Sequence, residues 1–472
     1  MASQGFEDMD LEHKKGDIET ASIQSQDVKQ RQDFKGWTLF LLAFQAVGTV
    51  YGDIGTSPLY VYSSTFSEAP ARDELLCCVS LIIWSLAIVV TLKYVLIVLY
   101  ANDAGEGGTF ALYSLLARYA SIEDKEPGKA TKELNRYKTN EISAPIHGVR
   151  SFFEKRRPVK LGIRFAGIFG VCCLLADGVF TPAQSVLGAI QGVRAQNPGL
   201  STGTIIGISI AILVVLFIAQ PLGINRLAFA YAPVVTIWLL FNVASAIYNL
   251  SKFDAGMFAA FNPYYAGKWF VVRGPAAGFH RLGGILLCFT GVEALFADVG
   301  AFSRNAIQLS WLCFAWPALT LTYIGQGKNP SNFANPFFLT LPPGCFWPGL
   351  IISILAAIVA SQAIITGSFQ ILSQAMALCY FPRMNIKFTS TIVHNQCYVP
   401  LANWLLMIGC IIVTGVFNNT TSLGNAYGLC VILVTMVTTF MVSLVAMLVW
   451  RFNPFLVVLP VFLIFGKRCL IV

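Results

Sequence analysis

Three acidic side chains lie inside runs of apolar residues that are long enough to cross a lipid bilayer. They are Asp53 in the run 37–66, Asp177 in the run 164–193 and Glu293 in the run 282–302. A charged carboxylate near the bilayer centre costs about 3 kcal/mol on insertion scales, so three without partners would cost on the order of 8 to 10 kcal/mol. Apart from the off-centre Lys93, no basic residue lies near the middle of a predicted span. We therefore expect a bound cation or a proton to neutralise these acids.

Hydroxyl groups accompany the acids in the same runs. They belong to Thr56, Ser57, Tyr60, Thr181, Ser185 and Thr290. Hydroxyls, carboxylates and backbone carbonyls freed at helix breaks are hard oxygen ligands, which suit an alkali cation. A divalent cation would require more converging carboxylates, and no histidine or thiolate accompanies the acids as a transition metal would require.

Glu293 is the predicted proton carrier among the three acids, because one monovalent cation does not need three carboxylates. Its neighbours Val292, Ala294 and Leu295 are apolar and favour the neutral carboxyl group. Two alternatives stay open: Glu293 is a fixed hydrogen-bond partner at a helix break, or Asp298 carries the proton instead.

Composition places these residues in an all-α polytopic membrane protein. Of the 472 residues, 56% are hydrophobic and 12% are charged, whereas a soluble protein carries about a quarter charged residues. Most Lys and Arg residues fall on one side of the predicted topology, which indicates membrane insertion and argues against binding of nucleic acid. The sequence contains no catalytic triad, phosphate loop or haem motif, so we expect neither an enzyme nor a cofactor.

Ten membrane spans follow from the apolar runs. They cover about 37–66, 75–100, 164–193, 202–220, 227–250, 282–302, 308–325, 347–381, 399–417 and 423–450. Residues 1–36 form a predicted cytosolic tail, 102–163 a cytosolic loop and 251–281 an extracytosolic loop. Residues 102–109 predict a tight glycine-rich turn before a short helix. Residues 451–472 read as a curtailed eleventh span.

Glycine and proline interrupt the spans that carry the acids. The first span contains Gly52, Gly55 and Pro58, and the third and sixth spans repeat the pattern of an acid close to glycine. In the third span, Asp177, Thr181 and Ser185 are four residues apart and share one helix face. Lys93 in the second span is interpreted as reaching toward the headgroups, with a functional ion pair as the alternative.

Interruptions in spans one and six predict two five-helix repeats, residues 37–250 and 282–450. An offset of five spans places the repeats in opposite orientations, so the repeat is inverted. We expect the cation site to lie between the two halves.

Four motifs resemble the signatures of the plant HAK/KUP/KT potassium transporters. They are Gly52-Asp-Ile-Gly-Thr-Ser-Pro-Leu-Tyr60, Gly105-Glu-Gly-Gly-Thr109, Ala176-Asp-Gly-Val-Phe-Thr-Pro182 and Gly291-Val-Glu-Ala-Leu-Phe-Ala-Asp298. The resemblance covers nearly all of residues 35–455. It implies a LeuT/APC-type fold and a secondary active transporter that imports potassium by proton symport. It also implies the plasma membrane, with the vacuolar or another internal membrane as the alternative.

The resemblance also implies roles for individual residues. Glu293 matches the glutamate that the family links to proton coupling. The potassium-binding positions of the family match Asp53, Tyr60, Asp177, Thr181, Ser185, Thr290 and Tyr427.

The chain departs from the family pattern after its tenth span. Family members have a twelfth span and a long cytosolic C-terminal domain, so the sequence resembles a C-terminally truncated form. This leaves a homodimer as a candidate assembly. Two other functions remain open: a potassium channel without proton coupling, and a truncated sensor or regulatory partner that does not transport.

Overall fold

Long apolar helices make up most of the structure, which is a computed structural model. It describes residues 35–103, 107–119, 156–222, 224–252, 255–327, 332–377, 381–382, 384–388, 397–417, 420–453 and 457. Most of the predicted tail, of the predicted loop 102–163 and of the predicted eleventh span lies outside these residues. In the described part, eight helices are long and apolar enough to cross a membrane, and a bent pair at the start makes a ninth.

Helices occupy all ten predicted spans. Seven of these spans contain one helix or a continuous series of helices: α5 (Arg72–Ser85) with η2 (Leu86–Val95) and η3 (Val98–Tyr100); α8 (Arg157–Gln191) with η5 (Gly192–Ala195); α9 (Thr202–Ala219) with η6 (Gln220–Leu222); α10 (Ile224–Lys252); α16 (Arg304–Ser310) with η9 (Trp311–Ala315) and α17 (Trp316–Gln326); α19 (Phe346–Ala377); and α21 (Thr420–Leu448). The ninth predicted span is α20 (Pro400–Val416), which has 17 residues.

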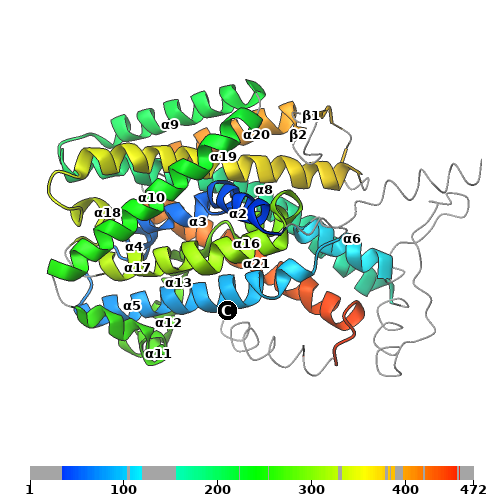
Figure 1. The fold of residues 1–472 in the computed structure, drawn as a ribbon, viewed down its shortest axis with the longest axis horizontal. Coiled ribbons are helices and arrows are strands. Elements are labelled where there is room, and N and C mark those ends of the chain that lie inside the picture. Colours follow the sequence, from blue (N-terminus) through cyan, green and yellow to red (C-terminus); the bar gives the residue numbers. More distant parts are fainter. Residues whose placement is uncertain are drawn as a thin grey trace, which may run out of the picture.

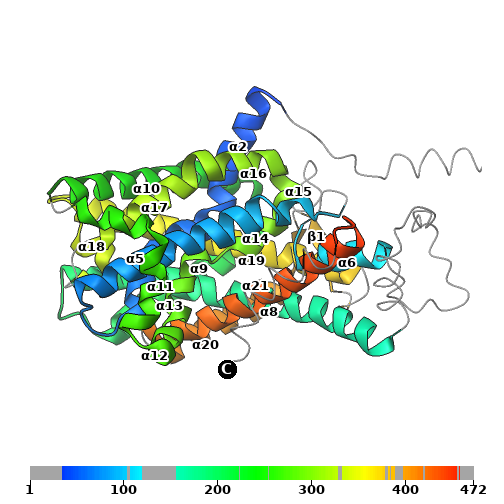
Figure 2. The same ribbon diagram turned by 90° about the horizontal axis from the view of Figure 1, so that it is seen from below.

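Short elements lie at the two ends of the bundle (Figures 1 and 2). One end carries η7 (Ala255–Phe261), α11 (Pro263–Val272), α12 (Pro275–His280) and α18 (Pro336–Leu339). The other end carries α6 (Thr109–Tyr119), β1 (Lys387–Phe388) and β2 (Cys397–Tyr398). The two strands pair antiparallel, with Lys387 opposite Tyr398, and this small ladder is missing from the all-α prediction.

The first span is broken next to Asp53, as the sequence predicts. Helix α2 (Trp37–Val50) meets α3 (Gly52–Thr56) at a bend of 58°. The chain continues through η1 (Ser57–Leu59), which has Pro58 in its first turn, and through α4 (Val61–Thr65). Trp238 of α10 donates a hydrogen bond to the carbonyl oxygen of Gly55 at 2.7 Å. A neighbouring helix thus supplies a partner for backbone near the break.

The sixth span is broken at Thr290 and Gly291. Before the break lie α13 (Leu282–Leu286) and η8 (Leu287–Phe289), and after it lie α14 (Val292–Ala297) and α15 (Val299–Phe302). Gly291 has φ of 79°, a left-handed conformation that glycine adopts without steric strain. This break agrees with the prediction.

The third span is not interrupted, and this part of the prediction is wrong. Helix α8 runs through Pro182 without a break. Proline at this position removes the hydrogen bond to the carbonyl of residue 178. The thiol of Cys410 on α20 lies 3.9 Å from the carbonyl oxygen of Gly178 and 3.4 Å from that of Val179. A neighbouring helix therefore compensates for the proline, and the helix stays continuous.

The broken first span is surrounded by other helices (Figure 1). Helix α3 packs against α19, and α8 packs against both α19 and α21. Helices α2 and α10 approach closely at Gly48, where an added Cβ atom would lie 2.3 Å from the backbone nitrogen of Ala232. This contact has no room for a larger residue.

Gly48→Ala should therefore destabilise the protein, because the new methyl group meets backbone that cannot rotate away. Overpacking of this kind costs about 1–3 kcal/mol. We expect a lower melting temperature, measured on the detergent-solubilised protein by tryptophan fluorescence. The control is Gly207→Ala in α9, where no atom lies within 4 Å of the added Cβ. Equal melting temperatures for the two variants would contradict this packing.

Candidate functional site

Asp53 lies at the centre of a cluster of oxygen atoms formed by four spans. Its side chain is 2% exposed. The hydroxyl of Thr290, at the break in the sixth span, lies 3.4 Å from Oδ1 of Asp53. The hydroxyl of Thr181 on α8 lies 3.5 Å from Oδ2. The two breaks meet here, since a Cβ atom on Gly291 would lie 2.9 Å from Oδ2 of Asp53.

Asp177 joins the cluster through Thr181. The Thr181 hydroxyl lies 2.8 Å from Oδ1 of Asp177 and 2.5 Å from the hydroxyl oxygen of Tyr427 on α21. The ring of Phe180 stacks on that of Tyr427 at 5.9 Å between centroids. The four-residue spacing of Asp177 and Thr181 thus places both on one face of α8, as predicted.

Three hydroxyl groups close the opposite side of Asp53. The Thr290 oxygen lies 3.0 Å from that of Ser57 and 3.3 Å from that of Tyr60. The Ser57 and Tyr60 oxygens are 3.4 Å apart. All three residues are buried. The segment after the first break therefore turns two hydroxyl groups toward the break in the sixth span.

The cluster has more acceptor oxygens than protons when both acids are ionised. The hydroxyl of Thr181 has one proton, but three oxygen atoms surround it. No basic side chain forms an ion pair with Asp53 or Asp177 in the part of the chain that the structure describes; the ion pairs of Asp73 with Lys268 and of Glu74 with Arg273 involve other acids. A buried carboxylate without a partner is unfavourable, so this arrangement suits a bound monovalent cation or an added proton.

Six of the eight predicted site residues converge in this cluster. Ser185 does not reach either carboxylate, because it lies further along α8 with its hydroxyl 3.4 Å from that of Thr56. Thr56 in turn donates to the backbone carbonyl of Asp53 at 3.0 Å. Ser185 therefore contacts the broken first span through Thr56 and is not adjacent to the acids.

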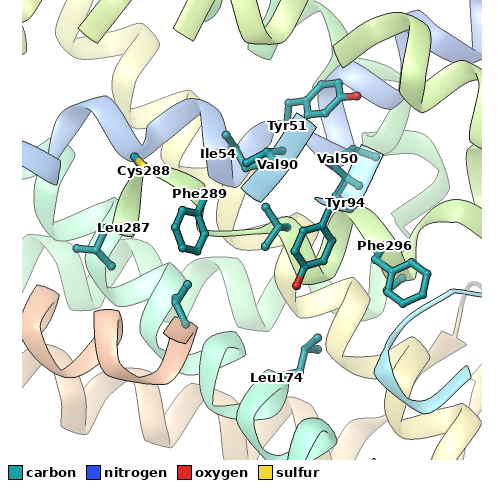
Figure 3. Close-up of a cluster of buried hydrophobic side chains, with 14 of the residues drawn as sticks. Val50, Tyr51, Ile54, Val90, Tyr94, Leu174, Leu287, Cys288, Phe289 and Phe296 are labelled. Atoms are coloured by element: carbon teal, nitrogen blue, oxygen red, sulfur yellow. The ribbon is translucent and has the colours of Figure 1, made fainter. Parts of the chain in front are cut away.

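Glu293 lies in a second cluster, which is built from other helices. Thr438 of α21 donates to Oε1 at 2.6 Å, and Thr109 of α6 donates to Oε2 at 3.3 Å. The hydroxyl of Tyr94 on η2 also donates to Oε1. In Figure 3 that hydroxyl points away from Tyr51 and toward the part of α8 that carries Leu174. Glu293 is thus a buried acid held by three hydroxyl groups, apart from the hydrogen-bonded group around Asp53.

Lys93 turns inward and does not reach toward the headgroups, so the favoured interpretation of this residue is wrong. Its ammonium group donates to the backbone carbonyl of Thr435 on α21 at 2.9 Å and lies 4.6 Å from the centre of the Tyr94 ring. The carbonyl of Thr435 offers the ammonium a partner inside the bundle.

Sequence reasoning missed the three hydroxyl partners of Glu293. Thr438 follows Tyr427 by eleven residues, which is three helical turns, so helical spacing places both on one face of α21. Thr109 ends the glycine-rich motif, which the sequence predicts only as a tight turn before a short helix. For Tyr94 we find no signal in the sequence.

Asp298, the alternative proton carrier, is buried at the start of α15 and makes no side-chain capping bond there.

Comparisons with known proteins match this chain to potassium transporters. Residues 40–470 match the family described as "K+ potassium transporter integral membrane domain". The chain is 40% identical over 450 residues to potassium transporter 5 of Arabidopsis thaliana, covering 93% of this chain and 56% of that protein. It is 42% identical over 435 residues to potassium transporter 1 of Oryza sativa subsp. japonica, covering 88% and 54%. The chain spans about half the length of the curated relatives it matches.

Thr181→Val should weaken cation binding, because valine keeps the shape of threonine but removes the hydroxyl shared by Asp53, Asp177 and Tyr427. Hydrogen bonds to charged groups contribute about 1.5–3 kcal/mol, which corresponds to at least about tenfold in affinity. Binding of rubidium-86 to purified protein measures this change. Thr181→Ser is the control and should bind nearly as the parent does. Unchanged binding by Thr181→Val would exclude this hydroxyl from the site.

Proposed function

Since the chain belongs to the HAK/KUP/KT family of potassium transporters, we propose that it is a secondary active transporter that imports potassium together with a proton. The family consists of transporters and not of enzymes. The observation that carries the proposal is the cluster around Asp53, where two carboxylates and five hydroxyl groups meet with no basic residue among them. A chain that only spanned the membrane would have no reason to bury these acids.

Potassium binding follows from the chemistry of the cluster. The ligands we assign are Asp53, Asp177, Tyr60, Thr181, Thr290 and Tyr427, with Ser185 supporting the helix break. A cation that enters must lose its hydration shell, and protein oxygens replace those water molecules. The carboxylates offset this cost of dehydration, because the cation neutralises negative charge that the apolar surroundings cannot solvate.

Glu293 is the proton carrier in this proposal. Its hydroxyl partners and the cluster around Asp53 share no residue. Two separate acidic sites can bind a cation and a proton at the same time, which symport requires. One site in which cation and proton competed would favour exchange instead.

The positions of the breaks support a LeuT/APC-type arrangement of two inverted five-helix repeats. The broken helices belong to spans one and six, and Thr290 contacts Ser57 and Asp53 across the boundary between residues 37–250 and 282–450. A site between two halves suits alternating access, in which one half rocks against the other. We place the protein in the plasma membrane and keep a homodimer as its candidate assembly.

Asp53→Asn should reduce potassium uptake about tenfold or more, because the amide keeps the shape of the side chain but removes the charge that binds the cation. The measurement is rubidium-86 uptake into liposomes that contain the 472-residue chain, with and without an inward proton gradient. Asp73→Asn is the control, because Asp73 lies at the loop end of α5 beside Lys268.

The same measurement separates this function from the two alternatives. An uptake rate that is the same with and without the proton gradient would indicate a channel. Rubidium binding without uptake would indicate a sensor or a regulatory partner. Full uptake by Asp53→Asn would contradict the assigned site.

Glu293→Gln should remove the response of uptake to pH, because glutamine keeps the hydrogen-bonding shape but cannot release a proton. The measurement is initial rubidium-86 uptake between pH 5 and pH 8. Asp298→Asn should keep the response of the parent protein. The reverse result, with pH dependence lost only in Asp298→Asn, would assign the proton to Asp298.

A further inference from the structure

The second span contains a π-helical segment, η2, at the point where it passes Glu293. In this segment the Thr91 hydroxyl donates to the carbonyl oxygen of Leu86, five residues earlier, at 3.2 Å. The backbone N–H of Leu96 donates to the carbonyl oxygen of Thr91, also five residues earlier, at 3.0 Å. Such segments are rare and often mark functional sites. Here the segment carries Lys93 and Tyr94 side by side, and both reach into the bundle.

Both residues reach the part of α21 that also holds Glu293. The ammonium of Lys93 binds the carbonyl of Thr435, and the hydroxyl of Thr438, one turn later, binds Oε1 of Glu293. Tyr94 connects the two groups, because its ring lies below the ammonium and its hydroxyl binds the same carboxylate.

Few other titratable groups face this pair among the described residues. From α8, Cys173 lies beside α21, where its carbonyl accepts a hydrogen bond from the thiol of Cys430 at 3.4 Å. The sequences of α19 and α21 contain no Asp, Glu, Lys, Arg or His. Thr109 is the residue of α6 that reaches the carboxylate. Among the described residues, Lys93 is the basic side chain that contacts both Tyr94, a hydrogen-bond partner of Glu293, and the turn of α21 next to Thr438.

A second π-helical segment, η9, forms a hydrogen bond with the first one, η2. The indole of Trp311 on η9 donates to the Thr91 hydroxyl at 2.9 Å. The Trp311 ring lies 5.5 Å from that of Tyr51, which stands at the bend before Asp53, and Tyr51 donates to the carbonyl of Ile307 at 2.7 Å. The segment that carries Lys93 is thus connected to the broken helix of the cation site.

We infer that Lys93 is a positioning residue for the proton step: its ammonium group stabilises the Glu293 carboxylate after the proton has left for water. This inference rests on the proposed function, because it presumes that Glu293 carries the proton. During the step the O–H bond of Glu293 breaks and the proton passes to water.

The test compares Lys93→Met with Lys93→Arg in rubidium-86 uptake between pH 5 and pH 8. Methionine has a similar length but no charge, so Glu293 keeps its proton to higher pH. The pH of half-maximal uptake should rise by about one unit or more, the size of effect that a nearby opposite charge exerts on an acid. Lys93→Arg should stay close to the parent. Lys268→Met, at the loop end of the bundle, is the control for loss of a lysine and should change nothing.

The outcomes separate this inference from the proposed function. A pH response that persists in Glu293→Gln would overturn the proton role of Glu293 and the inference with it. Loss of the response in Glu293→Gln, with an unchanged midpoint in Lys93→Met, would overturn the inference alone. If Lys93→Met does not fold, the double variant Lys93→Met/Glu293→Gln decides. If the double variant folds again, the two charges depend on each other, which supports the pairing of Lys93 with Glu293. If it does not fold, the pairing of Lys93 with Glu293 is overturned.

Discussion

Burial of charge without a fixed counter-ion is the constraint on which the structure depends. Asp53 and Asp177 lie among helices, hydroxyl groups and aromatic rings, and their described contacts include no basic side chain. Hydrogen bonds from hydroxyls lower the free energy of an ionised acid but do not neutralise it. In the proposed function, a bound cation supplies the remaining charge. The breaks in spans one and six follow from the same need, because they bring carbonyl and hydroxyl oxygens to the acids that a regular helix would keep apart.

The break in the sixth span connects the two acidic clusters. Thr290 contacts Asp53 on one side of Gly291, and Glu293 binds Tyr94, Thr109 and Thr438 on the other. Only two residues, Gly291 and Val292, separate Thr290 from Glu293. If potassium binds as proposed, a change in the contact of Thr290 would act on the short segment that also holds the second acid. The proposed coupling between the two sites would thus have a short physical path.

The sequence predicted the helices and the acids well, because both are properties of local composition. Apolar runs located the helices of all ten predicted spans, of which eight, or nine with the bent pair, are long and apolar enough to cross a membrane in the described part, and glycine and proline near Asp53 and Gly291 located two breaks. The same logic failed at Pro182, since Cys410 comes from a distant part of the chain and its contact is not visible locally. It failed at Lys93 for a related reason. The direction of a long side chain depends on which neighbour offers an acceptor, and here that neighbour is the carbonyl of Thr435.

The glycine-rich turn shows why residue type alone did not reveal the second cluster. A Cβ atom on Gly107 would lie 1.8 Å from the carbonyl oxygen of Phe296, and Gly108 has φ of 99°. These two glycines let the chain pass directly against α14 and begin α6 at Thr109, whose hydroxyl reaches Glu293. From the sequence, the turn is predicted only as a tight turn before a short helix. In the structure its glycines provide close approach between two backbones, and this approach places the third hydroxyl group on the buried acid.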